Sequence, residues 1–213
     1  MVVEQFRTGG DRNLAYLCAD EKWKSTLIID PSFDPESIHE YVKDWNLKVD
    51  YIINTHRHED HTNGNEHLRR YTGRRAVAYG DVEEITQNKL LDGARLPLGN
   101  LEIEIIHTPG HTEDCICLRV GDALFTGDTL FVGKIGGTST REQALTQYHS
   151  LHEKLLTLPD TVRVFPGHDV GVSPESSIGL ERKTNPFLLQ PDFESFYELK
   201  QNWLEYKSKH GIA

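Results

Sequence analysis

The feature that most constrains this chain is a run of metal-ligand side chains on one loop between a strand pattern and a helix pattern. The run, Thr55–His61, reads THRHEDH. Side chains alternate along an extended segment, so His56 and His58 project to the same side and their imidazoles can reach one ion. Asp60 and His61 lie beyond them, where the loop turns. This second pair offers ligands to a neighbouring ion.

Three more candidate ligands stand at the ends of predicted strands, each directly after a glycine. They are His111 in HTPGHT, Asp128 in FTGD and His168 in FPGHD. Glycine lets the backbone turn sharply, and a rigid scaffold presents such loop residues at a sheet edge. Three histidines with a carboxylate make a nearly closed donor set for one ion. An aspartate and two histidines that share that carboxylate make a set for a second ion.

Composition excludes several classes of partner. The chain has 23 Lys+Arg against 33 Asp+Glu, a net charge of −10, and 3 Cys. An acidic chain without a basic patch has no general attraction to nucleic acid or anionic lipid. No apolar run approaches the ~20 residues that cross a bilayer. We therefore expect a small-molecule substrate and neither a nucleic-acid nor a membrane partner.

The N-terminus and the cysteine content favour a cytoplasmic location. The first residues, MVVEQFRTGG, contain neither the basic region nor the apolar region of a secretory signal. The 3 Cys are too few for a disulfide scaffold, which agrees with a reducing compartment.

Hydrophobic periodicity predicts strands and helices along the whole chain. The predicted strands are 2–6, 13–18, 25–30, 48–54, 75–79, 101–105, 115–120, 122–126 and 162–165. The predicted helices are 35–45, 65–71, 141–158 and 193–209. The first three strands read as an antiparallel meander, and residues 81–100 have no clear pattern.

Two strand-rich halves, each followed by helices, predict an α/β architecture of packed layers. No long Pro/Gly/Ser linker separates the halves, so we expect them to form one catalytic domain, residues 1–173. Residues 174–213 are expected to form a short C-terminal helical extension that packs on the same domain.

Four sequence words occur in a fixed order. They are THRHEDH at 55–61, HTPGHT at 107–112, FTGDTLF at 125–131 and FPGHD at 165–169. With these words the sequence resembles the metallo-β-lactamase superfamily. Within it, the sequence is similar to the branch of glyoxalase II (hydroxyacylglutathione hydrolase) and persulfide dioxygenase. The resemblance implies the metallo-β-lactamase fold, a four-layer αββα sandwich with a metal site along one edge.

The resemblance also implies a role for each candidate ligand. One metal ion would be held by His56, His58, His111 and Asp128. The other would be held by Asp60, His61, His168 and a bridging Asp128. The two carboxylates, Asp60 and Asp128, are the candidate catalytic residues. Asp30, in the word LIIDP, matches an acidic residue of the family, and we expect it to orient a metal-bound histidine by accepting its free N–H.

A centre of this kind predicts hydrolysis. The pKa of water bound by divalent ions falls from ~15.7 to roughly 7, so hydroxide is available at neutral pH. The same ions can polarise a carbonyl and stabilise an oxyanion. We therefore predict a metal-dependent hydrolase that uses a metal-bound hydroxide, and the resemblance to glyoxalase II implies a thioester or ester as its substrate. Two divalent ions are expected, with zinc the first choice and iron or manganese the alternatives.

The same residues leave other functions open. One Fe(II) held by His56, His111 and Asp128, as the persulfide dioxygenase pattern implies, keeps positions free for O₂ and substrate. The words at 148–159 and 181–186 look like that branch. A nuclease would need a basic groove that the net charge of −10 does not supply. A non-catalytic metal-binding module is the remaining alternative.

Two positions depart from the glutathione-binding pattern of both enzyme families. Where they carry a basic residue after FTGD, this chain has Gly137, and Lys134 stands three residues earlier. Where they often carry a tyrosine after the last histidine, this chain has Val170. We therefore predict weak activity on S-lactoylglutathione.

Overall fold

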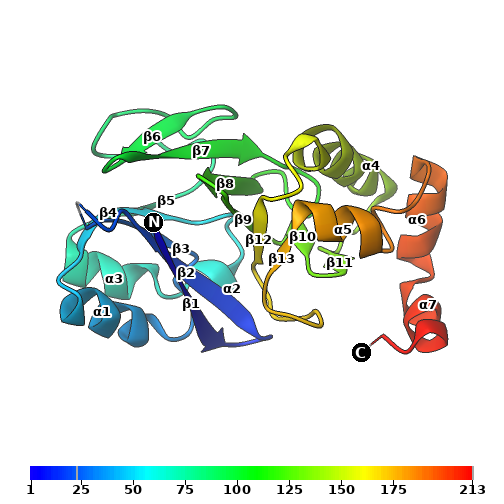
Figure 1. Cartoon of the computed structure of the whole chain (residues 1–213), viewed down its shortest axis with the longest axis horizontal. Coiled ribbons are helices and arrows are strands. Elements are labelled where there is room, and N and C mark those ends of the chain that lie inside the picture. The colour runs from blue at the N-terminus through cyan, green and yellow to red at the C-terminus, as the bar shows by residue number, and fades with distance from the viewer. Residues whose placement is uncertain (23, 213) are drawn as a thin grey trace.

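The computed structural model describes residues 1–22 and 24–212 of the chain. Two β-sheets pack face to face, and helices cover the outer side of each sheet (Figure 1). This arrangement is the predicted αββα sandwich. Within the described residues, no helix is long and apolar enough to cross a membrane.

Three hydrophobic clusters hold the four layers together. The largest lies between the sheets and joins Leu27 of the first sheet to Phe125 of the second. Another packs Ile38 of a helix on the outer face of the first sheet. The third packs Leu151 of a helical segment on the outer face of the second sheet. Both sheets are therefore apolar on their two faces, which explains their nearly continuous apolar strands.

The first sheet has the strand order β1-β2-β3-β4-β5. Its strands are β1 (Val2–Gly9), β2 (Asn13–Ala19), β3 (Ser25–Ile29), β4 (Lys48–Ile53) and β5 (Ala76–Val77). The antiparallel pairing of β1, β2 and β3 confirms the predicted meander, whereas β3, β4 and β5 pair in parallel. Parallel pairs need crossover connections. These contain α1 (Pro35–Asp44), α2 (Glu59–Thr62) and α3 (Asn65–Thr72).

The second sheet has the order β13-β12-β9-β8-β7-β6. Its strands are β6 (Arg95–Leu98), β7 (Leu101–His107), β8 (Ile116–Val120), β9 (Ala123–Gly127), β12 (Arg163–Pro166) and β13 (Ser176–Ser177). Only β9 and β12 run parallel, and the other pairs are antiparallel. A separate small hairpin, β10 (Leu130–Phe131) and β11 (Lys134–Ile135), follows β9. The sequence pattern predicted β7, β8, β9 and β12 but not β6, β13 or this hairpin.

The helical segments beside the second sheet are more broken than the periodicity predicts. In place of one helix over 141–158, the structure has α4 (Arg141–His149), a π-helical turn (Ser150–Lys154) and a 3₁₀ turn (Leu155–Thr157). The Ser150 hydroxyl, at the start of the π turn, donates to the Pro109 carbonyl at 2.7 Å. The segment stays helical over its length, but its hydrogen-bond pattern changes where it meets the loop that carries His111.

The C-terminal segment after β13 is helical and lies beside α4. It contains α5 (Ile178–Thr184), α6 (Phe193–Gln201) and α7 (Trp203–His210). The predicted single helix over 193–209 is therefore divided at Asn202. Phe196 and Leu199 of α6 belong to the same apolar cluster as Leu151. This contact places α6 against the outer helical layer of the second sheet, at the right of Figure 1.

Candidate metal centre

Strand ends from both sheets carry all the predicted ligands. His56 and His58 follow β4, and Asp60 and His61 lie in the single turn of α2 just beyond. The loop after β7 carries His111. The ligands Asp128 and His168 follow the parallel strands β9 and β12. The carboxyl ends of parallel strands lie at one edge of a sheet, so these loops converge there.

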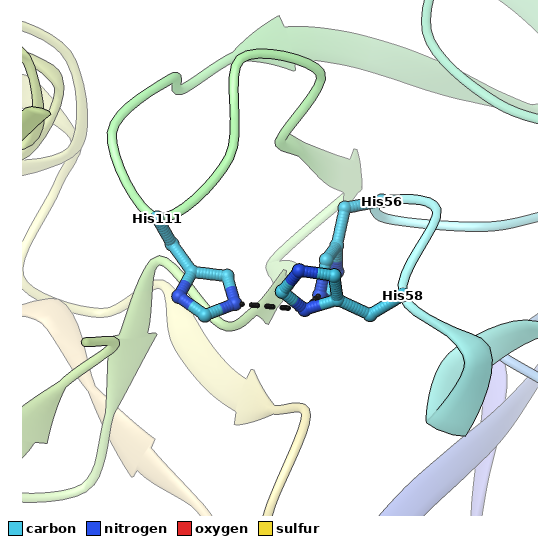
Figure 2. A group of neighbouring side chains, drawn as sticks. All are labelled: His56, His58 and His111. Atoms are coloured by element: carbon cyan, nitrogen blue, oxygen red, sulfur yellow. Dashed lines mark hydrogen bonds between the residues drawn. The ribbon is translucent and has the colours of Figure 1, made fainter. Parts of the chain in front are cut away.

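The first histidine group contains His56, His58 and His111. Figure 2 shows His56 and His58 on one loop, facing His111 on another. The His58 Nδ1 atom lies 3.0 Å from His56 Nε2 and 3.1 Å from His111 Nε2. Nitrogens bonded at about 2.0–2.1 Å to one tetrahedral ion would be about 3.3 Å apart. The spacing of the three imidazoles therefore fits a shared metal ion.

The second group contains Asp60, His61 and His168. The Nε2 atoms of His61 and His168 are 3.3 Å apart. The Asp60 Oδ2 atom lies 3.6 Å from the first of these nitrogens and 3.5 Å from the second. All three ligand atoms fall within 4.8 Å of one another. This group has the composition and the spacing for a second ion.

Asp128 lies between the two groups, with one carboxylate oxygen toward each. Its Oδ1 is 3.4 Å from both His61 Nε2 and His168 Nε2, and its Oδ2 is 3.5 Å from His111 Nε2. Among the described residues, Oδ1 is buried and has no hydrogen-bond partner. A buried, unsatisfied carboxylate oxygen is unfavourable unless a cation satisfies it. The residues present therefore fit two metal ions with Asp128 between them.

Groups outside the ligand set orient three of the imidazoles. The Nδ1 atom of His61 lies 3.0 Å from Asp30 Oδ2, and that of His111 lies 2.8 Å from the Gly137 carbonyl oxygen. The His168 Nδ1 atom lies 2.8 Å from the Asp11 carbonyl oxygen. These oxygens accept hydrogen bonds only, so Nδ1 carries the hydrogen and Nε2 is left for a metal.

Asp30 contacts the start of the ligand loop. It accepts the Thr55 backbone N–H at 2.7 Å and the Thr55 hydroxyl at 2.6 Å in addition to His61. Sequence reasoning missed Asn13, whose amide donates to Asp60 Oδ2 at 2.9 Å. It also missed the two backbone carbonyls that accept from histidines. A contact to a backbone carbonyl has no residue-type signal, so the sequence contained nothing to find them by.

Glycines in the sequence words are required by close approach at the centre. A Cβ atom at Gly167 would lie 2.5 Å from Asp128 Oδ1 and 2.9 Å from His61 Cε1. Gly127 has φ of +48°, and its Cβ would collide with the Thr55 side chain. The backbone at both positions therefore packs directly against ligand or ligand-supporting side chains.

The buried histidines His61 and His56 have pKa values shifted in opposite directions. Burial disfavours the charged form of His61, but the Asp30 and Asp128 carboxylates outweigh it and raise the pKa of His61 to about 11. Burial also acts against the Asp128 carboxylate, yet His168 and His61 hold its pKa well below the usual range. Burial and the nearby His61 lower the pKa of His56 to about 4. Without metal, His61 is therefore protonated at neutral pH and His56 is neutral.

The positions that depart from the glutathione pattern have other roles. The Gly137 carbonyl accepts from His111, and the Lys134 ammonium donates to the Val170 carbonyl at 2.7 Å. A cavity of about 580 Å³ lies beside this contact, with mainly apolar walls. Its walls include Val132, Val170, Val172, Leu180 and Ile212.

The chain matches a known protein family over most of its length. The family model described as "Metallo-beta-lactamase superfamily" matches residues 8–100 and 79–168. The matched residues contain every candidate ligand and Asp30.

Curated relatives carry two kinds of enzyme name. "Probable hydroxyacylglutathione hydrolase glo2" of Schizosaccharomyces pombe is 35% identical over 169 residues, which span 76% of this chain and 65% of that protein, less than two thirds of its length. "Probable polyketide biosynthesis zinc-dependent hydrolase BaeB" of Bacillus velezensis is 30% identical over 94% of this chain and 90% of that protein. "Persulfide dioxygenase ETHE1, mitochondrial" of Bos taurus is 33% identical over 81% of this chain and 70% of that protein.

A solved structure is similar to this chain over nearly its whole length. The crystal structure of ETHE1 from Myxococcus xanthus matches with a TM-score of 0.86 and 30% sequence identity. The match covers 95% of this chain and 91% of that one.

Proposed function

Because the chain belongs to the metallo-beta-lactamase superfamily, we propose that it is a metal-dependent hydrolase of small-molecule thioesters or esters. The observation that carries the proposal is the position of Asp128. Its two oxygens face two separate groups of ligand atoms. A single ion in the first group would leave the ligand atoms of Asp60, His61 and His168 without a metal ion, whereas two ions would be bound by all the candidate ligands.

Two divalent ions would be held by the groups described above, with zinc the expected metal. When bound, they supply Lewis acidity for a carbonyl and lower the pKa of water at the site. The protein contributes orientation, because Asp30, Gly137 and Asp11 hold three imidazoles with Nε2 inward. The Asp60 side chain is 38% exposed and that of Asp128 10%. Asp60 is therefore the ligand carboxylate within reach of a substrate.

The substrate is proposed to be a thioester other than a glutathione conjugate. Gly137 supplies no side-chain cation, and the nearby Lys134 ammonium is bound to the Val170 carbonyl. The cavity that Lys134 and Val170 line has mainly apolar walls, with Glu181 and His210 also among them. Such walls favour an apolar substrate group over the charged glutathione peptide. This substrate preference agrees with the weak activity on S-lactoylglutathione that the sequence predicts.

A second candidate function is oxidation of a persulfide by a single Fe(II). It is favoured by the 33% identity to the bovine persulfide dioxygenase and by the match to the Myxococcus ETHE1 structure over 95% of this chain. In this reading His56, His111 and Asp128 hold the iron. Two histidines and one carboxylate are a ligand set typical of non-haem Fe(II) oxygenases.

Metal content and two activity assays distinguish the candidates. Protein purified without added metal is analysed for its elements, tested on a panel of thioesters and tested for O₂ uptake with a persulfide. The hydrolase proposal predicts two ions per chain and thioester cleavage without O₂ uptake. One iron per chain with persulfide-dependent O₂ uptake would favour the dioxygenase instead.

A further inference from the structure

We propose that Lys200, on α6 of the C-terminal segment, is a positioning residue for the metal ligand His111. The inference rests on the proposed metal centre. It concerns a lysine far along the chain from every ligand, which acts through the backbone of the Gly136–Gly137 turn.

Lys200 and Gln147 together hold one backbone carbonyl. The Lys200 ammonium donates to the Gly136 carbonyl at 3.0 Å and to Gln147 Oε1 at 2.6 Å. The Gln147 amide also donates to the Gly136 carbonyl, at 3.1 Å. Gln147 is fully buried on α4. The turn is therefore fixed by two side chains from two different helices.

The same turn orients His111. The Gly137 carbonyl, one residue after the carbonyl that Lys200 holds, accepts from His111 Nδ1 at 2.8 Å. A Cβ atom at Gly136 would lie 3.3 Å from His111 Cγ, so the turn also packs against the imidazole ring. On the other side, a Cβ at Gly110 would lie 2.5 Å from the Cα of Gln147. Lys200 and Gln147 together therefore support both backbone segments beside His111, that of Gly110 and that of Gly136–Gly137.

The surroundings of Lys200 disfavour its charged ammonium unless hydrogen bonds compensate for the lost solvation. Burial lowers the pKa of Lys200 to about 8. Among the described residues, no carboxylate forms an ion pair with Lys200, and its ammonium lies 5.7 Å from the centre of the Phe196 ring. A partly buried cation without a counter-charge is unfavourable. Its contacts to the Gly136–Gly137 turn are the compensation that the structure offers.

Removal of the ammonium should loosen the turn and with it the Nδ1 acceptor of His111. Groups that orient metal-bound histidines change metal affinity by about 10–100-fold when they are lost. The effect should fall on the ion of the first group, because the second group is oriented by Asp30 and Asp11 instead.

The test uses Lys200→Met, which keeps the length of the side chain and removes its donors. The control is Lys209→Met, at an exposed position on α7. The full chain is loaded with Zn²⁺ or Co²⁺ and titrated with a chelator, and unfolding of the metal-free protein is followed in parallel. We expect Lys200→Met to lose one ion at a chelator concentration about 10–100-fold below that for wild type and to keep the other. We also expect an altered Co²⁺ absorption spectrum, with Lys209→Met unchanged.

A conservative variant separates positioning from simple attachment of α6. Lys200→Arg keeps a cationic donor and should recover most of the metal affinity. If Lys200→Met does not fold, Lys200→Gln, whose amide is too short to reach Gly136, replaces it with the same expectation. Wild-type affinity for both ions in a folded Lys200→Met protein, even with a lower unfolding midpoint, would overturn the inference. Absence of metal binding in wild type would instead overturn the proposed function.

Discussion

The carboxylate of Asp30 and the imidazole of His61 face each other at 3.0 Å, and both side chains are almost completely buried. Asp30 also receives two hydrogen bonds from Thr55, at the start of the ligand loop. One residue therefore connects the first sheet, the loop that carries His56 and His58, and the orientation of a ligand in the second group. Its φ of +48° places it in a conformation that few non-glycine residues adopt.

Asp30→Asn should retain the fold and weaken the metal centre. Asparagine keeps the shape, but its neutral amide no longer supports the His61 N–H as a carboxylate does. We expect metal affinity or activity to fall by about 10–100-fold. Chelator competition and turnover are the measurements, with the exposed Asp122→Asn as the control. A change in thermal stability alone would refute the orienting role.

Paired substitutions at His58 and Asp128 separate the two candidate functions. With two ions, His58→Ala and Asp128→Ala should both lose metal, because each residue contributes to the first group and Asp128 to both. With one iron held by His56, His111 and Asp128, His58→Ala should keep its ion. Metal-to-protein ratios after gel filtration give the answer. Equal metal loss in both variants excludes the single-iron model.

Metal binding should release protons and weaken as the pH falls. The pKa of His61 is raised from 6.5 to about 11 by the Asp30 and Asp128 carboxylates against the opposing effect of burial, so its ring is protonated at pH 8 without metal. A metal ion must displace this proton in order to bind. For each proton displaced, the Kd for the metal ion should rise about tenfold when the pH is lowered by one unit between pH 9 and 7. Calorimetry in two buffers of different ionisation enthalpy measures the release. Identical heats in both buffers would contradict this charge distribution.

The free energy of unfolding of the metal-free protein should also depend on the protonation of His61, and it should fall as the pH rises. A histidine whose pKa is higher in the folded state than in the unfolded state stabilises the fold fully below about pH 6.5. This contribution is lost as the pH rises through the folded-state pKa of about 11. Denaturant unfolding of metal-free wild type, compared with His61→Gln at pH 6 and pH 10, should show a gap that narrows at pH 10. A constant gap would argue against a charged His61.

A cation at residue 137 should improve the use of glutathione thioesters. A Cβ atom added at Gly137 meets no atom within 4 Å, so the backbone there has room for the first atom of an arginine side chain. One charge-assisted contact of about 1.4 kcal/mol lowers KM for S-lactoylglutathione about tenfold. KM for an uncharged thioester should not change. Leu204→Arg, at an exposed position on α7, is the control. An equal gain in both variants would point to general charge attraction.

The sequence predicted the centre better than its surroundings, for a physical reason. Regular strand patterns precede four of the ligands, His56, His111, Asp128 and His168. The glycines directly before three of them indicate sharp turns. Such signals are local, so they can be read without the fold.

Contacts between distant segments had no comparable signal. Lys200 is an ordinary polar position in a helical pattern, yet the packing of α6 on α4 brings it to Gly136. The change from α-helical to π-helical hydrogen bonding at Ser150 likewise coincides with a tertiary contact, the hydrogen bond to the Pro109 carbonyl. Periodicity reports which face of a helix is buried, but it does not report what that face meets.

The most direct test of the account is an anomalous difference map from crystals of the metal-loaded protein, recorded at the absorption edge of the bound metal. A two-metal centre should give two peaks about 3.5–4 Å apart. One should lie within bonding distance of His56, His58 and His111 and the other of Asp60, His61 and His168, with Asp128 contacting both. A single peak bonded to His56, His111 and Asp128, or no peak among these residues, would contradict it.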